Sequence, residues 1–216
     1  MSRVTIIDYG LCNILSVTRG FESVGAEVEL TDSAAAIDRA ERLVLPGVGA
    51  FADGMAGLRE KGLVEPLREY AKSGRPLIGV CLGMQMLLET NEEFGIHEGL
   101  GLIPGRVVAI PGTDADGRAH KIPHIGWTDL VPPEGTTPES WKKTVFKEIR
   151  PGTAAYFVHS YTAVTTNRAN RLADSYYGGQ LISAAVYSGN VYGCQFHPEK
   201  SGPIGLSILK SFMELR

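Results

Sequence analysis

One cysteine in this chain lies in a local pattern that suits a nucleophile. Cys81 follows the apolar run 76–80, and Gly79 and Gly83 stand two residues to either side of it. This is the spacing of a nucleophile elbow, a sharp turn between a strand and a helix, with Cys in place of Ser. The N-terminus of the following helix stabilises a thiolate, and the amide of Leu82 is expected to point toward an oxyanion. The alternative is that Cys81 is a small buried residue that ends a strand. The flanking glycines alone do not decide between this hypothesis and a nucleophile.

A base and an acid stand together near the other end of the chain, in the run QFHPE. Pro198 disfavours helical backbone in the preceding residue, so His197 is expected in extended chain. Residues two apart then face the same side, and Glu199 can accept from one imidazole nitrogen while the other takes a proton from a thiol. The pattern therefore predicts a triad with Cys81. The alternatives are a solvated loop, or a metal pair of His197 with Cys194, for which no second Cys or His cluster is present.

The elements that must position these residues follow from hydrophobic periodicity. Apolar runs at 4–8, 27–31, 42–45 and 76–80 alternate with segments of helical spacing at 11–24, 32–40, 53–71 and 81–90. Connections of this length favour parallel strands joined by crossover helices, and the continuous apolar run LIGV is typical of a central strand. Cys81 is thus expected where a central strand meets the helix that follows it.

The rest of the chain has a different pattern. Short β-like runs stand at 106–110, 154–161, 172–177, 180–187 and 191–196, and an amphipathic helix is expected at 203–215. These runs predict an antiparallel extension beside the parallel sheet. Since the sequence shows no internal repeat or linker, we expect an α/β fold, with a mostly parallel central sheet flanked by helices, in a single domain over 1–216.

Composition excludes several classes of function. The 216 residues carry a net charge of −3, and the Lys and Arg residues form no basic stripe of the kind that tracks nucleic acid. The three cysteines, Cys12, Cys81 and Cys194, are far apart and odd in number, which favours a reducing compartment. The N-terminus lacks a signal-peptide pattern, and no apolar stretch is suited to a membrane span. We therefore expect a cytoplasmic protein.

With these residues in place, the chain resembles the class I (triad) glutamine amidotransferases over essentially its whole length. CLGMQ and HPE match the two signatures of that family and are about 115 residues apart. Within the family, the segments IIDYG, LPGVGAF, PHIGW, YFVHSY and FHPEKSG are similar to the glutaminase subunits of imidazole glycerol phosphate synthases. Two positions depart from the pattern: Cys12 stands before Asn13 in place of glycine, and Thr128 stands in place of the asparagine of GWN.

The resemblance implies a role for each matching residue. Cys81 would be the nucleophile, His197 the general base and acid, and Glu199 the group that orients the imidazole. Gln85 and the backbone around Ser160 and Tyr161 would bind the amino-acid end of glutamine. The oxyanion would be held by the amide of Leu82 together with that of Val48 or Gly49. The residues implied at a partner's face are Tyr156, Lys200 and Asn13. Without the resemblance, Gln85 reads as a helix-surface residue, the tyrosines as core aromatics and Lys200 as an ordinary exposed lysine. His159 is expected to be packed or hydrogen-bonded, without a chemical role.

The chemistry so implied is hydrolysis of glutamine through a cysteine thioester, which needs no metal or organic cofactor. Nothing in the chain is left over for an ammonia acceptor, so we expect a separate synthase subunit over the active-site mouth. By resemblance this partner is a cyclase barrel that forms a heterodimer with the chain and makes imidazole glycerol phosphate and an aminoimidazole carboxamide ribotide in histidine biosynthesis. A cysteine peptidase, a γ-glutamyl hydrolase and a non-enzymatic regulatory subunit are the competing hypotheses.

The loop PGVG carries one further expectation. Glycines on either side of Val48 let a peptide plane rotate, because Gly accepts positive φ at little steric cost. One oxyanion donor would then point away from Cys81 until the partner binds, and the free subunit would be nearly inactive. A simple tight turn is the commoner use of such glycines.

Overall fold

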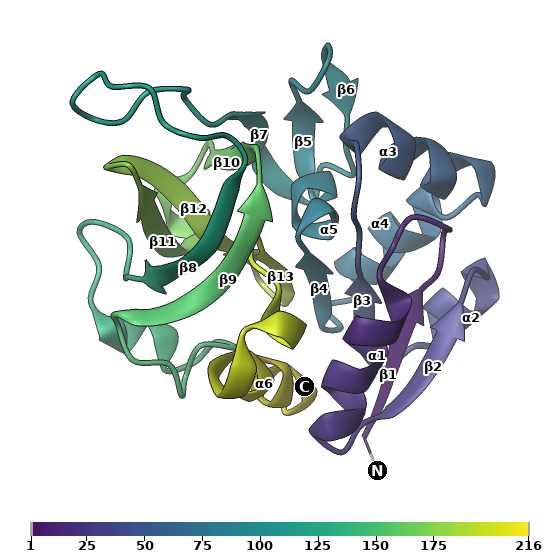
Figure 1. Cartoon of the computed structure of the whole chain (residues 1–216). Coiled ribbons are helices and arrows are strands. Elements are labelled where there is room, and N and C mark those ends of the chain that lie inside the picture. Colours follow the sequence, from purple (N-terminus) through teal and green to yellow (C-terminus); the bar gives the residue numbers. More distant parts are fainter. Residues whose placement is uncertain (1, 216) are drawn as a thin grey trace.

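A seven-stranded sheet forms the centre of the protein in the computed structural model, which describes residues 2–215 (Figure 1). Its strand order is β11-β12-β13-β4-β3-β1-β2. The parallel strands are β1 (Arg3–Ile7), β2 (Glu27–Thr31), β3 (Leu43–Leu45), β4 (Leu77–Val80) and β13 (Val191–Cys194). β12 (Gln180–Ser188) and β11 (Arg171–Tyr177) continue the sheet antiparallel at one edge. This arrangement confirms the predicted α/β class and an antiparallel extension. The run expected at 191–196 as part of that extension is instead β13, which pairs parallel with β4, and only its other edge pairs antiparallel with β12.

Helices cover both faces of the sheet, because successive side chains of a buried strand point to opposite faces. Val44 of β3 packs into one apolar cluster, and Leu43 and Leu45 pack into the other. The helices are α1 (Ile14–Ser23), α2 (Ala34–Arg39), α3 (Phe51–Glu60), α4 (Val64–Lys72), α5 (Leu82–Met86) and α6 (Gly202–Met213). α1 and α6 contribute to the first cluster, whereas α3, α4 and α5 contribute to the second.

Two smaller sheets complete the fold. One has the order β10-β7-β5-β6, and the other pairs β8 with β9. Their bounds are β5 (Leu88–Asn91), β6 (His97–Glu98), β7 (Ile103–Ala109), β8 (His124–Leu130), β9 (Thr153–His159) and β10 (Tyr161–Thr165). β8 and β9 form a strongly curved ribbon (Figure 1), in which β8 contacts β11 and β9 contacts α6. Short 3-10 helices lie at Pro138–Trp141, Arg168–Asn170 and Pro198–Lys200.

Three further expected elements differ from the structure. The single helix expected at 53–71 is two helices, because Gly62 takes a φ of 65° and ends the first. The helix expected at 81–90 ends at Met86, and the chain continues as β5, which pairs with β7 and β6. Residues 82–88 are all buried, so their apolar spacing did not distinguish a helical face from a buried strand. The run 154–161 is two strands that belong to different sheets and meet at Ser160. Within residues 2–215, no helix combines the length and apolar character needed to span a membrane.

Candidate active site

The nucleophile elbow expected at Cys81 is present at the end of β4. Cys81 has φ 55° and ψ −110°, a strained conformation for a residue with a side chain. A Cβ on Gly79 would lie 2.6 Å from the carbonyl oxygen of Gly83, and a Cβ on Gly83 would overlap the carbonyl oxygen of Leu45. Both glycines are therefore required by the close backbone packing that holds the turn.

The sheet brings the HPE segment beside this elbow. β13 runs parallel to β4 with Cys194 opposite Val80, so the loops that follow the two strands leave the same edge of the sheet. The backbone N–H of Cys81 donates to the carbonyl of Cys194 at 2.8 Å, and the N–H of His197 donates to the carbonyl of Tyr156 at 3.0 Å. These contacts place the imidazole and the thiol at one site.

His197 and Glu199 face each other as their spacing predicted. Nδ1 of His197 lies 2.8 Å from Oε1 of Glu199, and the side chains are only 4% and 2% exposed. Burial acts to lower the pKa of His197, but its interactions with Cys81 and Glu199 outweigh burial and raise the pKa to about 9. The site thus favours the charged, imidazolium form of His197 near neutral pH.

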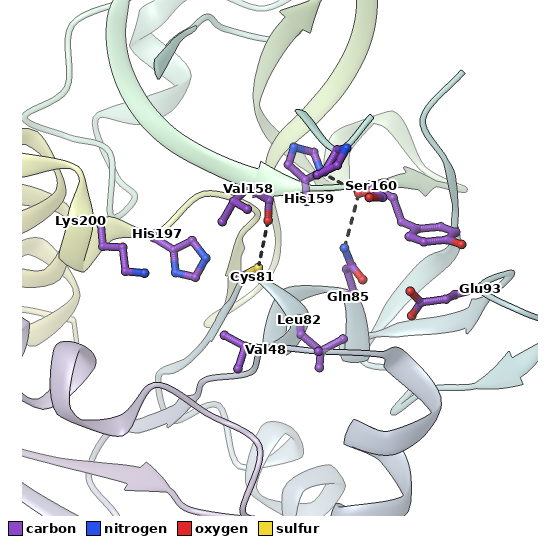
Figure 2. Close-up of a pocket in the computed structure, with 13 residues that line it drawn as sticks. Val48, Cys81, Leu82, Gln85, Glu93, Val158, His159, Ser160, His197 and Lys200 are labelled. Carbon is purple, nitrogen blue, oxygen red and sulfur yellow. Dashed lines mark hydrogen bonds between the residues drawn. The ribbon is translucent and has the colours of Figure 1, made fainter. Parts of the chain in front are cut away.

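A cleft of about 420 Å³ opens over the thiol, within the size range of small-ligand sites. Figure 2 shows Cys81 near its centre, with His197 and Lys200 on one side and Gln85 and Glu93 on the other. The expected residues that line the cleft are Val48, Gly49, Cys81, Leu82, Gln85, Ser160, Tyr161, His197 and Lys200. The structure therefore gathers the residues expected for chemistry and for substrate at one place.

Two of the backbone amides expected to hold an oxyanion, those of Leu82 and Val48, are bonded elsewhere in this structure. The N–H of Leu82 donates to the carbonyl of Gly47 at 3.3 Å, and the N–H of Val48 donates to the carbonyl of Leu11 at 3.0 Å. The peptide between Gly47 and Val48 thus turns its oxygen toward Leu82 and its N–H away. In this conformation, therefore, neither of these two N–H groups is free to donate to an oxyanion.

Gln85 is a buried residue, so the helix-surface alternative is wrong. Its side chain is held at both ends, because Nε2 donates to the carbonyl of Tyr161 at 3.4 Å and to Oε1 of Gln195 at 3.1 Å. Oε1 of Gln85 accepts from Nδ2 of Asn91 at 3.5 Å. This network ties α5 to β5, to β10 and to the residue that follows β13, along the wall of the cleft.

Two titratable residues that line the cleft were not assigned to it from the sequence. Oε2 of Glu93 accepts from the backbone N–H of Phe51 at 2.7 Å. In the sequence run NEEFG, nothing distinguishes Glu93 from the adjacent Glu92. Only the fold does so, because the chain after β5 turns toward α3 and brings Glu93 to the cleft. His159 is buried and hydrogen-bonded as expected, yet it also lines the cleft.

The residues expected at a partner's face lie at different positions on the site. Lys200 is exposed at the edge of the cleft, and Tyr156 is half-buried with its ring 5.9 Å from that of Trp127. Asn13 is exposed and caps α1 by accepting from the N–H of Ser16 at 3.4 Å. Only Lys200 of the three contributes to the cleft itself.

The other two cysteines differ from Cys81 in their surroundings. Burial raises the pKa of Cys12 to about 11 and also raises the pKa of Cys194, so both thiols stay protonated near neutral pH. Sγ of Cys12 lies 3.9 Å from the carbonyl of Ile7. Among residues 2–215, no three His, Cys, Asp or Glu side chains are grouped to hold a metal ion.

This fold and cleft define a class of protein. The family model for class-I glutamine amidotransferases matches residues 5–215, and the chain belongs to that family. Among curated proteins, it is 53% identical over 215 residues to imidazole glycerol phosphate synthase subunit HisH 1 of Legionella pneumophila (strain Lens), with 100% of both chains covered. The subunit HisH of Syntrophotalea carbinolica is 45% identical and covers 98% of this chain and 100% of its own. The resemblance predicted from the motifs is thereby confirmed.

Solved structures support the fold at lower identity. A chain in the structure of PurLQS from Thermotoga maritima has a TM-score of 0.72 at 20% identity, covering 98% of this chain and 97% of that chain. A crystal structure of a glutamine amidotransferase also has a TM-score of 0.72, at 17% identity, and covers 98% and 99%. At such identities the likeness establishes the shared fold.

Proposed function

We propose that this chain hydrolyses glutamine to glutamate and ammonia through a thioester on Cys81. The observation that carries the proposal is the buried His197–Glu199 pair beside a strained cysteine that lines the cleft. The Cys81 thiolate attacks the side-chain carboxamide carbon of glutamine, and the imidazolium of His197 gives its proton to the departing ammonia. His197 then takes a proton from water, which attacks the thioester and releases glutamate and the thiol. Glu199 accepts from Nδ1–H of His197 and so directs the other ring nitrogen to these proton transfers.

The opposite side of the cleft suits the amino-acid end of glutamine. Gln85 and the backbone at Ser160 and Tyr161 line it, as does the carboxylate of Glu93. Backbone N–H groups can hold the α-carboxylate of the substrate, and the Glu93 carboxylate attracts its α-ammonium group. Recognition of both charged groups favours free glutamine over a γ-glutamyl group within a longer chain.

We further propose that the oxyanion hole is completed only when a partner subunit binds. With the carbonyl of Gly47 turned toward Leu82, the site presents an oxygen where the transition state requires N–H donors. Rotation of the Gly47–Val48 peptide would release the N–H of Leu82 and bring in the N–H of Val48. That rotation changes ψ of Gly47 and φ of Val48, and Gly47, which has no side chain, accepts the change at little steric cost.

The partner we propose is the cyclase subunit of an imidazole glycerol phosphate synthase, as the names of the relatives suggest. Ammonia must reach an acceptor before it becomes ammonium, which requires the cyclase to dock over the cleft. In this proposal the chain acts in the cytoplasm as a single glutamine amidotransferase domain of a heterodimer, its ammonia serves histidine biosynthesis, and Tyr156, Lys200 and Asn13 lie toward the cyclase.

The test is to purify the chain with its native partners and to measure glutamate release with and without them. Glutamate release that depends on the partner supports the proposal. The Cys81→Ala variant should lose this activity, whereas the partner's reaction should continue when ammonia is supplied directly. Glutamine hydrolysis by the Cys81→Ala variant would show that the assigned nucleophile is wrong.

A further inference from the structure

Two buried histidines join the curved ribbon β8–β9 to the substrate side of the cleft. Oγ1 of Thr128 lies 2.8 Å from Nε2 of His124, and Nδ1 of His124 lies 3.1 Å from Nε2 of His159. Nδ1 of His159 lies 2.8 Å from the carbonyl oxygen of Tyr161. These contacts form one continuous chain of hydrogen bonds, called here the histidine relay, which ends on the backbone of the cleft.

The geometry of the ribbon explains how these side chains meet. His124 and His159 are directly opposite in the antiparallel register of β8 and β9, where side chains on one face are in contact. His124, Gly126 and Thr128 alternate onto the same side of β8. Gly126 has a φ of 140° and no side chain, so the backbone can bend there and let the side chains of His124 and Thr128 meet.

The hydrogen-bond chain allows one tautomer for each ring when both are neutral. The carbonyl of Tyr161 can only accept, so Nδ1 of His159 must carry its proton. Nε2 of His159 is then an acceptor and requires a proton on Nδ1 of His124. Nε2 of His124 accepts in turn from the hydroxyl of Thr128. Every donor in the relay thus points toward the cleft.

The surroundings keep both rings neutral. His124 and His159 are only 1% and 6% exposed, and His124 is stacked between the rings of Phe157 and Tyr177 at 5.0 and 4.2 Å. Burial is the main cause that lowers the pKa of His124 to about 4 and that of His159 to about 3. Near pH 7, with both rings neutral, each group of the relay therefore donates its hydrogen bond in the same direction, from Thr128 toward the Tyr161 carbonyl.

We propose that His124, His159 and Thr128 are positioning residues, which fix the Tyr161 carbonyl and through it the substrate-binding side of the cleft. That carbonyl lies just after Ser160, where β9 ends in one sheet and β10 begins in another, and it also accepts from Nε2 of Gln85. The inference rests on the proposed binding of glutamine along Ser160 and Tyr161. It gives a role to Thr128, one of the two positions that depart from the family pattern, and to His159, for which the sequence suggested none.

The tautomers can be tested without any assay of activity. With only five histidines in the chain, ¹⁵N NMR of the imidazole nitrogens at pH 7 is practicable, and the His124→Phe and His159→Phe variants assign the two signals. Both rings are expected to be neutral with the proton on Nδ1. A charged ring, or a proton on Nε2 of His159, would overturn the relay whatever reaction the chain catalyses.

The positioning role is tested by glutamine binding in the Cys81→Ala background, where the ligand is not consumed. Thr128→Val removes the hydroxyl and should raise the Kd for glutamine by about three- to tenfold, the effect typical of one hydrogen bond. Thr128→Ser, which keeps the hydroxyl, should restore the Kd to within about twofold. Thr18→Val is the matched control, because the Thr18 hydroxyl has no hydrogen-bond partner among the described residues.

Kinetics of the complex with its native partner distinguish positioning from chemistry. Thr128→Val should raise KM for glutamine by a similar factor and leave kcat within about twofold. An unchanged KM and Kd in a wild-type complex that hydrolyses glutamine would overturn the positioning role alone. A wild-type complex that neither binds nor hydrolyses glutamine would overturn the proposed function, while the NMR result would still report on the relay.

Discussion

At the scale of single residues, the backbone at Cys81 combines chemistry with strain. A residue with a side chain at φ 55° and ψ −110° costs of order 1–3 kcal/mol, and the close contacts of Gly79 and Gly83 leave the turn no way to relax. The strained turn places the sulfur in the cleft beside His197. Stability is therefore given up where the thiol must be presented to substrate.

This strain predicts that Cys81→Gly is more stable than Cys81→Ala by about 1 kcal/mol, because glycine accepts positive φ while alanine does not. The gain is partly offset by the greater freedom of glycine in the unfolded chain. Urea denaturation of the two variants measures the difference, and neither should release glutamate from glutamine. An alanine variant as stable as the glycine variant would show that the turn is not strained.

The His197–Glu199 pair predicts a graded loss of activity. Glu199→Gln should be milder than His197→Ala, because proton transfer rests on the imidazole, and a general base typically contributes about 10²–10⁴-fold. The pKa of His197 should also fall in the Glu199→Gln variant, since the carboxylate is among the groups that raise it. NMR titration of His197 and the steady-state rate of glutamate release test the two effects. Equal, total losses in two folded variants would assign Glu199 a different role.

At the scale of elements, hydrophobic periodicity predicted the strands of the parallel sheet and the helices α1, α2 and α6. The burial environment of each of these elements stays the same along its length. Periodicity failed from Leu82 to Asn91, because residues 82–88 are all buried and their pattern hides the change from α5 to β5. Most of the candidate site was nevertheless predicted, because short motifs at the ends of β4 and β13 carry it. Glu93 was missed, since only the packing of β5 against the start of α3 distinguishes it from other surface acids.

The orientation of the oxyanion loop predicts a nearly inactive free chain. Two N–H groups are bonded away from the site in this structure, to Gly47 and Leu11. Loss of one oxyanion donor typically costs about 10²–10³-fold in rate. Glutaminase turnover should therefore rise by at least that factor when the partner and its acceptor substrate are added. Full turnover by the isolated chain would show that the loop is a simple turn.

At the scale of the whole molecule, the histidine relay makes global stability depend on pH. His124 and His159 have pKa values lowered to about 4 and about 3, chiefly by burial, whereas histidine in an unfolded chain titrates near 6.5. Their contribution to stability is present above pH 6.5 and is lost as the pH falls toward 4, because the unfolded chain then binds more protons than the folded one. Each additional proton bound by the unfolded chain changes the free energy of unfolding by about 1.4 kcal/mol per pH unit. The two histidines together therefore give a slope of up to about 2.7 kcal/mol per pH unit.

The prediction is that the free energy of unfolding decreases steeply between pH 6.5 and 4.5, and that His124→Phe about halves the part of this slope due to the pair. Phenylalanine keeps the stacking on Phe157 and Tyr177 but cannot take up a proton. It also leaves Nε2 of His159 without a donor, so the variant should be less stable than wild type at pH 7 by about 1–3 kcal/mol. Urea denaturation at pH 6.5, 5.5 and 4.5 measures both quantities. If the free energy of unfolding changed with pH equally in wild type and in His124→Phe, the protonation of His124 would not differ between the folded and unfolded states. The neutral relay would then be wrong.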